Sequence, residues 1–356
     1  MSCRLVIATL AGLALAGCAQ PAKPPPPGAP FMTFNTVYAP DGAELPLRTF
    51  LPAGAPRAVL IGVHGFNDYS NAFSDAGLYF MKHGVALYAY DQRGFGDAPE
   101  RGHWVGQRQL IADLRLVVSL VHQRHPGLPV FLVGESMGGA LVMVAMTEPD
   151  PPPVDGIVLV APAVRGRVTL TPLERTVLDI TSSAIPWFTV TGQGLHIVPS
   201  DNVTMLRQLA DDPLMITHTR LDTLRGLVDL MDAALAAAPH LTTPSLILNG
   251  ERDEIVTPFP TCLMLADLPP RPPGAWRFML YPRGYHMLLR DRHADLVLTD
   301  IAHWIADRNA ALPSGDERLT GTRDTGLTAV ADLSTCNKVA DRLRVHPLLA
   351  PLAAGK

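Results

Sequence analysis

A serine with glycines on both sides stands between two apolar runs in residues 130–142, VFLVGESMGGALV. Residues Gly134 to Gly138 fit the pattern G-x-S-x-G, and the flanking runs are typical of a buried strand and a helix. In that setting the serine occupies a strained turn, and the helix that follows directs N–H groups and its positive dipole end at the site. The pattern alone is common, but its setting favours Ser136 as a nucleophile over part of a simple glycine-rich turn.

A serine hydroxyl attacks effectively only when a base removes its proton, and the sequence offers one histidine in the right place. Among twelve histidines, His286 directly follows an expected strand in YPRGYHMLL. The imidazole needs an acceptor that fixes its tautomer and stabilises its positive charge. Asp253 follows another expected strand in LILNGERDEIV, with Glu251 and Glu254 as alternatives. The order Ser136, Asp253, His286 is the one expected when such groups occupy an α/β sheet.

Attack on a carbonyl also requires hydrogen-bond donors for the oxygen that gains negative charge. The N–H of Met137, the residue after the serine, is the first expected donor. The second is the N–H of Phe66, in the loop after the apolar run LIGVHG. His64 in that loop is then expected to hold the loop by a hydrogen bond and not to act as a second base.

These groups must be positioned by a parallel sheet, because apolar strand patterns alternate with helical ones along the chain. Continuous apolar runs are typical of strands buried on both faces, and the helical segments between them form crossovers. An Asp41-Gly42 hairpin signal separates two β-rich runs near the start. The expected strands are RAVLIGVHG, GVALYAYDQRG, VFLVGES, DGIVLVAPAV, PSLILNGERDEIV and WRFMLYPRG.

The alternation stops between about 165 and 240, where the sequence shows helical spacing and no strand pattern. Three helical segments are expected there: TPLERTVLDITSSAI, SDNVTMLRQLADDP and TLRGLVDLMDAALAAA. An insertion at this point would lie over the carboxyl edge of the strands, where ligands bind in such sheets. We interpret it as a helical cap.

The motifs HGFNDYS, YDQRGFGDAP, GESMGGA, NGERDEIV and GYH, in this order, resemble the monoacylglycerol lipase and lysophospholipase branch of the α/β-hydrolases. The resemblance covers about 33–308. It implies a triad of Ser136, His286 and Asp253, an oxyanion hole from Phe66 and Met137, a cap over an acyl pocket, and no metal or cofactor.

The chain departs from the family pattern in two places. Asp97-Ala98 stands where relatives often carry a small hydroxyl residue, and Glu135 replaces a commoner histidine beside the nucleophile. Neither change affects the triad, but both concern the surroundings that choose the substrate.

The N-terminus predicts export and a lipid anchor. Residues 1–17 contain Arg4 and an apolar run of signal-peptide size, too short to span a bilayer comfortably. The residues LAGC ending at Cys18 resemble a bacterial lipobox, in which the cysteine is lipidated. The alternatives are an ordinary signal peptide or a buried helix start. A proline-rich tether at 18–32 follows, and Ala19 favours the outer membrane, with the protein facing the periplasm.

Two cysteines then remain for the folded part of the chain, Cys262 and Cys336. In an oxidising compartment they could form a disulfide, or they could stay as buried free thiols. A net charge of −4 gives no reason to expect nucleic acid as a partner, and no CxxC or HExxH metal signature is present.

The sequence therefore predicts a signal peptide (1–17), a tether (18–32), an α/β-hydrolase domain (33–310) and a C-terminal extension (311–356). The expected function is that of a serine ester hydrolase acting through an acyl-enzyme on monoacylglycerol- or lysophospholipid-type esters. The alternatives are an amide or peptide hydrolase of the kind that releases N-terminal proline, a non-catalytic envelope lipoprotein, and an acyltransferase.

Overall fold

A computed structural model describes residues 28–192, 194, 196–269, 275–320 and 336. The predicted signal peptide, the lipidation at Cys18 and most of the tether fall outside the described residues, and so does most of the C-terminal extension.

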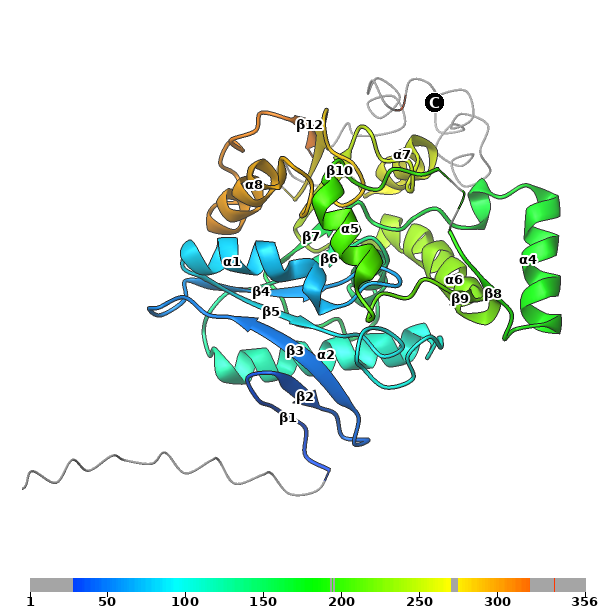
Figure 1. Ribbon diagram of the computed structural model, residues 1–356. Coiled ribbons are helices and arrows are strands. Elements are labelled where there is room, and N and C mark those ends of the chain that lie inside the picture. Colours follow the sequence, from blue (N-terminus) through cyan, green and yellow to red (C-terminus); the bar gives the residue numbers. More distant parts are fainter. Residues whose placement is uncertain (1–27, 193, 195, 270–274, 321–335, 337–356) are drawn as a thin grey trace, which may run out of the picture.

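A ten-stranded sheet forms the centre of the molecule, in the order β1-β2-β3-β5-β4-β6-β7-β10-β11-β12 (Figure 1). Its strands from β5 to β11 in that order pair in parallel, and the outer strands pair antiparallel. This confirms the predicted mostly parallel sheet. The strand bounds are β1 Phe31–Met32, β2 Thr36–Tyr38, β3 Glu44–Phe50, β4 Ala58–Val63, β5 Val85–Tyr90, β6 Val130–Glu135, β7 Gly156–Val160, β10 Ser245–Gly250, β11 Trp276–Tyr281 and β12 Glu317–Thr320.

Helices cover both faces of the sheet because neighbouring strand residues point to opposite sides. Leu60 of β4 packs into one core with α1 and α8, whereas Val59 and Ile61 pack into the other core with α2, α3 and α7. Every residue of the six central strands is buried, which explains why they read as continuous apolar runs. The bounds of these helices are α1 Ser74–Lys82, preceded by the 3-10 turn η1 Ser70–Phe73, α2 Gln107–Arg124, α3 Met137–Ala145, α7 Pro258–Asp267 and α8 Ala294–Ala306.

The insertion between β7 and β10 contains the three expected helices. Its sequence also holds a two-stranded antiparallel sheet that the pattern did not predict, because strands of two residues show no periodicity. The third helix, α6, packs against α3 and contributes Leu227, Leu230 and Leu235 to the main core, so it belongs to the body as much as to the cap. The bounds are η2 Arg167–Thr169, α4 Pro172–Ala184, β8 Thr189–Val190, α5 Val203–Asp211, β9 Thr219–Arg220, α6 Leu221–Ala237 and η3 Ala238–His240.

The sheet extends beyond the predicted domain limits of 33 and 310 at both ends. It begins with β1, whose Phe31 pairs with Tyr38 of β2. It ends with β12, whose Leu319 pairs with Phe278 of β11. Residues on either side of the predicted limits are therefore part of the sheet.

A disulfide joins Cys262 of α7 to Cys336, 74 residues further along the chain. Both cysteines are fully buried. A cross-link between such distant residues removes conformational freedom mainly from the unfolded chain, and the effect grows with the length of the loop.

We expect Cys336→Ser to lower the free energy of unfolding by about 2–4 kcal/mol, because the unfolded chain regains the freedom of the closed loop. Guanidinium denaturation with and without reductant measures this difference. Reductant should destabilise the unmodified chain by a similar amount and leave the variant unchanged. Alkylation of both thiols in the absence of reductant would contradict the bond.

Candidate active site

Ser136 lies in a sharp turn between β6 and α3, with φ 53° and ψ −115°. A positive φ is costly for a residue with a side chain and persists only where surrounding contacts hold it. Two backbone hydrogen bonds do so: the Ser136 N–H donates to Val160 O (2.9 Å), and the Ala163 N–H donates to Ser136 O (2.9 Å). The turn presents the serine at the carboxyl edge of the sheet, directly after β6.

The glycines of the motif are required by close packing. A Cβ atom at Gly138 would overlap the backbone of Val63 and His64, and one at Gly134 would overlap the backbone of Gly138. The first turn of α3 is therefore seated directly against the end of β4. This brings the loop after β4, with Phe66, beside the serine.

The structure brings together Ser136, His286 and Asp253. His286 Nε2 lies 3.0 Å from Ser136 Oγ, and His286 Nδ1 lies 2.8 Å from Asp253 Oδ2. The second oxygen, Asp253 Oδ1, accepts the backbone N–H groups of Ile255 (2.8 Å) and Val256 (2.9 Å). These bonds fix the carboxylate, which fixes the ring with its Nδ1–H toward Asp253 and Nε2 free to accept the serine proton.

The two alternative carboxylates are placed elsewhere. Glu251 and Glu254 are both exposed, and Glu254 accepts the backbone N–H of Val198 (2.9 Å). Asp253, which is buried beside His286, is the carboxylate that contacts the ring.

His286 is held as a stronger base than an ordinary histidine. Burial alone would lower its pKa, but the charge of Asp253, the hydrogen bond from the ring to Asp253 and the charge of Glu135 outweigh that effect and raise the pKa. A base of this kind is well suited to take a proton from a serine hydroxyl.

The two expected oxyanion donors lie on either side of the serine turn: Met137 directly follows Ser136, and Phe66 lines the same cavity as Ser136. Met137 is the first residue of α3, so its N–H has no acceptor within the helix. Within the part of the chain that the structure describes, the Phe66 N–H has no acceptor either. Both N–H groups can therefore donate to a substrate oxygen beside Ser136.

His64 holds the loop that carries Phe66. Its Nδ1–H donates to Gly65 O (2.8 Å), and its Nε2 accepts the N–H of Gln92 (3.0 Å). Burial lowers the pKa of His64, so the ring is neutral, as the acceptor role of Nε2 requires. The expected structural role of His64 agrees with these contacts.

A cavity of about 460 Å³ opens above Ser136 and His286 and is lined mainly by apolar side chains. The cap supplies much of that lining, which suits a hydrocarbon chain better than a polar group. The apolar residues from the cap are Leu206, Leu209, Ala210, Met215, Ile216, Leu227 and Met231.

Three charged residues in the wall of this cavity were not assigned a role from the sequence: Asp68, Glu135 and Arg290. Glu135 was noted only as an unusual neighbour of the serine. Asp68 lies within the HGFNDYS motif and Arg290 lies four residues after His286, and this closeness to the motifs is the only signal that the sequence offers.

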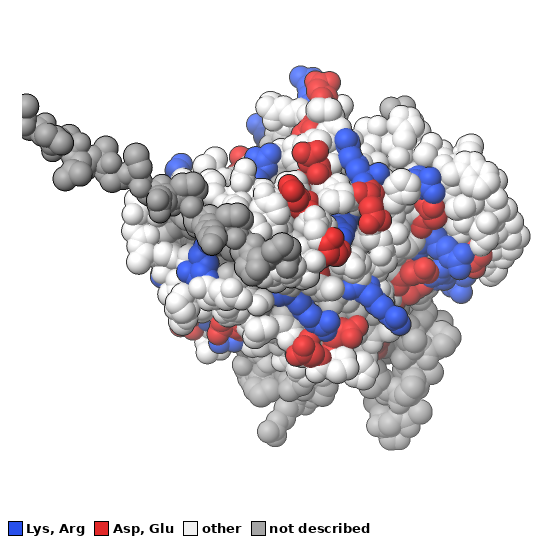
Figure 2. All heavy atoms as spheres, turned by 90° about the horizontal axis from the view of Figure 1, so that it is seen from below, with Lys and Arg blue, Asp and Glu red and all other residues white. Residues whose placement is uncertain are grey.

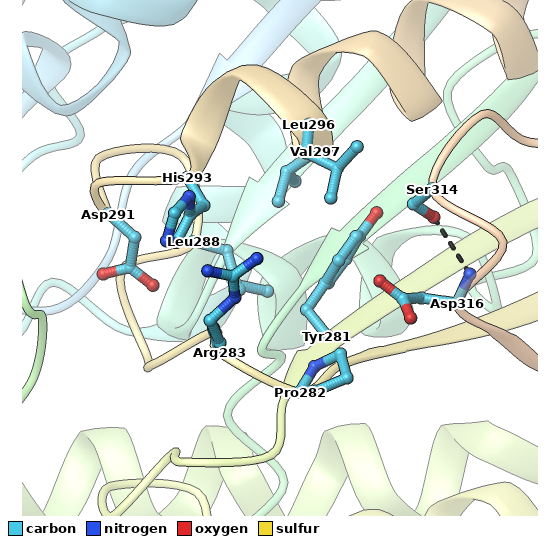
Figure 3. A pocket seen from close by; sticks show the side chains of 11 residues that line it. Tyr281, Pro282, Arg283, Leu288, Asp291, His293, Leu296, Val297, Ser314 and Asp316 are labelled. Carbon is cyan, nitrogen blue, oxygen red and sulfur yellow. Dashed lines mark hydrogen bonds between the residues drawn. The ribbon is translucent and has the colours of Figure 1, made fainter.

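A second cavity, of about 410 Å³, lies along the same segment that carries His286 (Figure 3). It is lined by Tyr281, Arg283, Leu288 and the start of α8, and it contains none of the triad residues. The segment between β11 and α8 therefore separates two cavities, of which only the one under the cap reaches Ser136.

Within the described residues, no group of three or more histidine, cysteine, aspartate or glutamate side chains could hold a metal ion.

Comparison with known proteins places the chain in a family. The family model described as "Serine aminopeptidase, S33" matches residues 54–293. A monoacylglycerol lipase of Mycolicibacterium smegmatis is 27% identical over 267 residues, which cover 74% of this chain and 93% of that protein. A monoglyceride lipase of Rattus norvegicus is 25% identical over 294 residues, which cover 80% and 94%.

Solved structures show the same fold. The monoacylglycerol lipase of Paleococcus ferrophilus superimposes with a TM-score of 0.63 at 22% identity, covering 74% of this chain and 99% of that one. A carboxyl esterase of Bacillus coagulans gives a TM-score of 0.62 at 20% identity, covering 79% and 98%.

We expect kcat/KM for a neutral ester to rise with pH, with a midpoint above the ordinary histidine value of 6.5, because the ring must lose its proton before it can act as a base. Initial rates with p-nitrophenyl butyrate from pH 5 to 9 measure the profile. A flat profile or a midpoint below 6.5 would contradict the role of His286.

We expect Asp253→Asn to lower kcat for the same ester by about 10⁴-fold, since the ring loses the partner that orients it.

Proposed function

Since the chain belongs to the serine aminopeptidase family of α/β-hydrolases, we propose that it is a serine ester hydrolase that cleaves monoacylglycerol-type carboxylic esters. The observation that carries the proposal is the hydrogen-bonded series Ser136–His286–Asp253 at the floor of an apolar cavity. The names of the relatives, monoacylglycerol and monoglyceride lipases, support the same substrate class.

The geometry performs the reaction in two halves. Ser136 Oγ attacks the ester carbonyl while its proton passes to His286 Nε2, and Asp253 stabilises the imidazolium that forms. The carbonyl oxygen becomes an oxyanion and accepts the N–H groups of Phe66 and Met137. The intermediate then expels the alcohol, which takes the proton from His286, and leaves an acyl group on the serine.

Water completes the cycle by the same route. His286 takes a proton from the water as its oxygen attacks the acyl carbonyl. The second tetrahedral intermediate releases the carboxylic acid, and the proton on His286 returns to Ser136 Oγ. One ester and one water thus give one acid and one alcohol.

An amine-recognising peptidase has less support in this cavity. Recognition of a free amine requires a carboxylate available to pair with it. The two carboxylates in the wall beside the triad, Asp68 and Glu135, both already contact Arg290.

We further propose that the protein is attached to the bacterial outer membrane through a lipid on Cys18 and faces the periplasm. No helix in the described ranges is long and apolar enough to cross a membrane. The proposal rests on the signal-like residues 1–17, the lipobox-like LAGC and the proline-rich segment after it. Ten residues of extended proline-rich chain reach about 30 Å, so the described domain would stay close to the bilayer.

Helix α4 supports contact between the cap and that bilayer. Its apolar side chains face outward, whereas those of an ordinary surface helix face the core. Leu173, Val177 and Ile180 form one helical stripe and are all exposed, at 72, 50 and 61%. The only residue of α4 that is buried is a serine, Ser182. A capping box with Thr171 nonetheless gives the helix a well-defined start.

The apolar surface continues beyond α4 into Trp187 and Phe188, which are both exposed. Figure 2 shows a broad area without charged side chains at the right-hand edge, on the side where Figure 1 places α4. Aromatic side chains beside an apolar helix are typical of a surface that lies in a membrane interface. A lipid surface is also the place where an acylglycerol would be found.

We expect hydrolysis of 1-monoacylglycerols and p-nitrophenyl esters, and labelling by a fluorophosphonate probe, both abolished in Ser136→Ala. Each activity depends on the serine as nucleophile, so removing its hydroxyl removes both. Ser200→Ala, which changes a buried serine outside the triad, serves as the matched control and should remain labelled. Persistent labelling of Ser136→Ala, or no turnover of any ester, would contradict the function.

We expect the triple change Leu173→Ser, Ile180→Ser and Trp187→Ser to weaken binding to phosphatidylethanolamine–phosphatidylglycerol vesicles at least about tenfold. None of the three side chains lines the cavity over Ser136, so turnover of p-nitrophenyl butyrate should not change. The measurement is vesicle co-sedimentation of the chain from residue 18 onward with Cys18→Ser, which removes the lipid.

A control with Phe34→Ser and Leu78→Ser removes exposed apolar groups from other parts of the surface and should bind as the parent does. Equal loss of binding in both variants would contradict a specific role for the cap. A change of oligomeric state in the triple variant alone would instead identify α4 as a contact between copies.

A further inference from the structure

A buried ionic cluster of three side chains, none used by the mechanism above, lies beside the triad. Arg290 Nη2 lies 2.6 Å from Asp68 Oδ2 and 3.2 Å from Glu135 Oε2. All three residues are at least nine-tenths buried, with exposed fractions of 6, 3 and 2%. Arg290 Nε and Glu135 Oε1 have no partner among the described residues, so the cluster is not saturated with hydrogen bonds.

Each member of the cluster belongs to a different segment that carries part of the catalytic machinery. Asp68 is two residues after Phe66, the oxyanion donor of the β4 loop. Glu135 directly precedes Ser136 at the end of β6. Arg290 is four residues after His286, in the segment between β11 and α8. The guanidinium of Arg290, which is close to the base in sequence, thus contacts one residue near the oxyanion donor and one beside the nucleophile.

We propose that Arg290 is a positioning residue that, by pairing with Asp68 and Glu135, holds the oxyanion loop, the nucleophile turn and the histidine segment at the spacing that the reaction needs. This inference rests on the proposed hydrolase function and extends it to residues that touch no reacting atom.

The forked, planar shape of arginine suits this role. Its guanidinium can donate to two carboxylates at once in fixed directions, which the point charge of a lysine cannot do equally well. Asp68 is itself held in place, since its Oδ1 accepts the N–H of Tyr69 (2.8 Å). The direction of the Arg290–Asp68 bond is therefore set by the backbone on one side and by the guanidinium on the other.

Stability alone does not account for the cluster. Burial of charged groups is costly, and a buried ion pair often gives no more stability than well-packed apolar residues of the same size. Burial alone would lower the pKa of Arg290, but Asp68 and Glu135 outweigh it and keep the guanidinium charged. Burial raises the pKa of Glu135 despite the opposing charge of Arg290.

The cluster also acts on the base through its charges. Four charged groups influence or face His286: Asp253, Glu135, Arg290 and Asp291. An ionised Glu135 favours the imidazolium and Arg290 disfavours it, so the two act on the pKa of His286 in opposite directions. A change that removes one of them should shift the pH profile, which a merely structural contact would not do.

The first test uses the full chain with Arg290→Met, Arg290→Lys and, as a matched control, Arg283→Met on the same segment. Arg283 is exposed and outside the cluster. With p-nitrophenyl butyrate, Arg290→Met should lower kcat by about 100-fold with little change in KM, as expected for misplaced groups and intact binding. Arg290→Lys should recover part of the loss, and Arg283→Met should match the parent.

A second variant separates positioning from simple loss of stability. Arg290→Met leaves two buried carboxylates without a cation and is expected to lower Tm. Combining it with Asp68→Asn and Glu135→Gln removes the uncompensated charges, so most of the Tm should return while kcat stays low. Return of both Tm and kcat to the parent values would overturn the proposal.

The third arm is the pH profile of Glu135→Gln alone. Loss of the Glu135 charge should move the acid limb of kcat/KM to lower pH, because the imidazolium loses a stabilising anion. An unshifted limb together with unchanged kcat in Arg290→Met would overturn the proposal. These outcomes can be told apart from failure of the hydrolase function itself, in which the unmodified chain would turn over no ester.

Discussion

The backbone turn at Ser136 is the constraint on which the rest of the site depends. A serine held at φ 53° needs hydrogen bonds on both sides, which Val160 at the end of β7 and Ala163 just after it supply. The turn also needs an α3 start without a side chain at Gly138, so that the helix can rest on the end of β4. Three neighbouring strands are thus fixed relative to one another before any catalytic group is considered.

The remaining groups follow from the parallel order of the strands. Because β4, β6, β10 and β11 end at the same edge, Phe66, Ser136, Asp253 and His286 meet there although they are far apart in the sequence. Strand ends of a parallel sheet are predictable from apolar runs, and this explains why the fold and the placement of these four residues could be inferred from sequence. The proposed role of each of these four residues follows from its position at this edge together with the chemistry of its side chain or N–H group.

Other features depend on contacts that leave no local pattern. The β8–β9 pair is too short to show periodicity, and β12 joins the sheet from a segment that reads as a polar tail. The packing of α6 on α3 is a tertiary choice, because an amphipathic helix does not reveal which partner covers it. The ionic cluster combines three segments whose individual charges look like ordinary surface residues. The apolar stripe of α4 has ordinary helical spacing in the sequence, and only the structure shows that it faces outward.

The bond between Cys262 and Cys336 has a consequence for how the protein withstands damage. The closed segment contains β11, His286, α8 and β12. A single break of the peptide chain anywhere inside that segment leaves both fragments covalently joined. The fragment with the catalytic base could not diffuse away, and the two pieces could refold together. A nick in this segment would therefore leave His286 tethered to the part of the domain that carries Ser136.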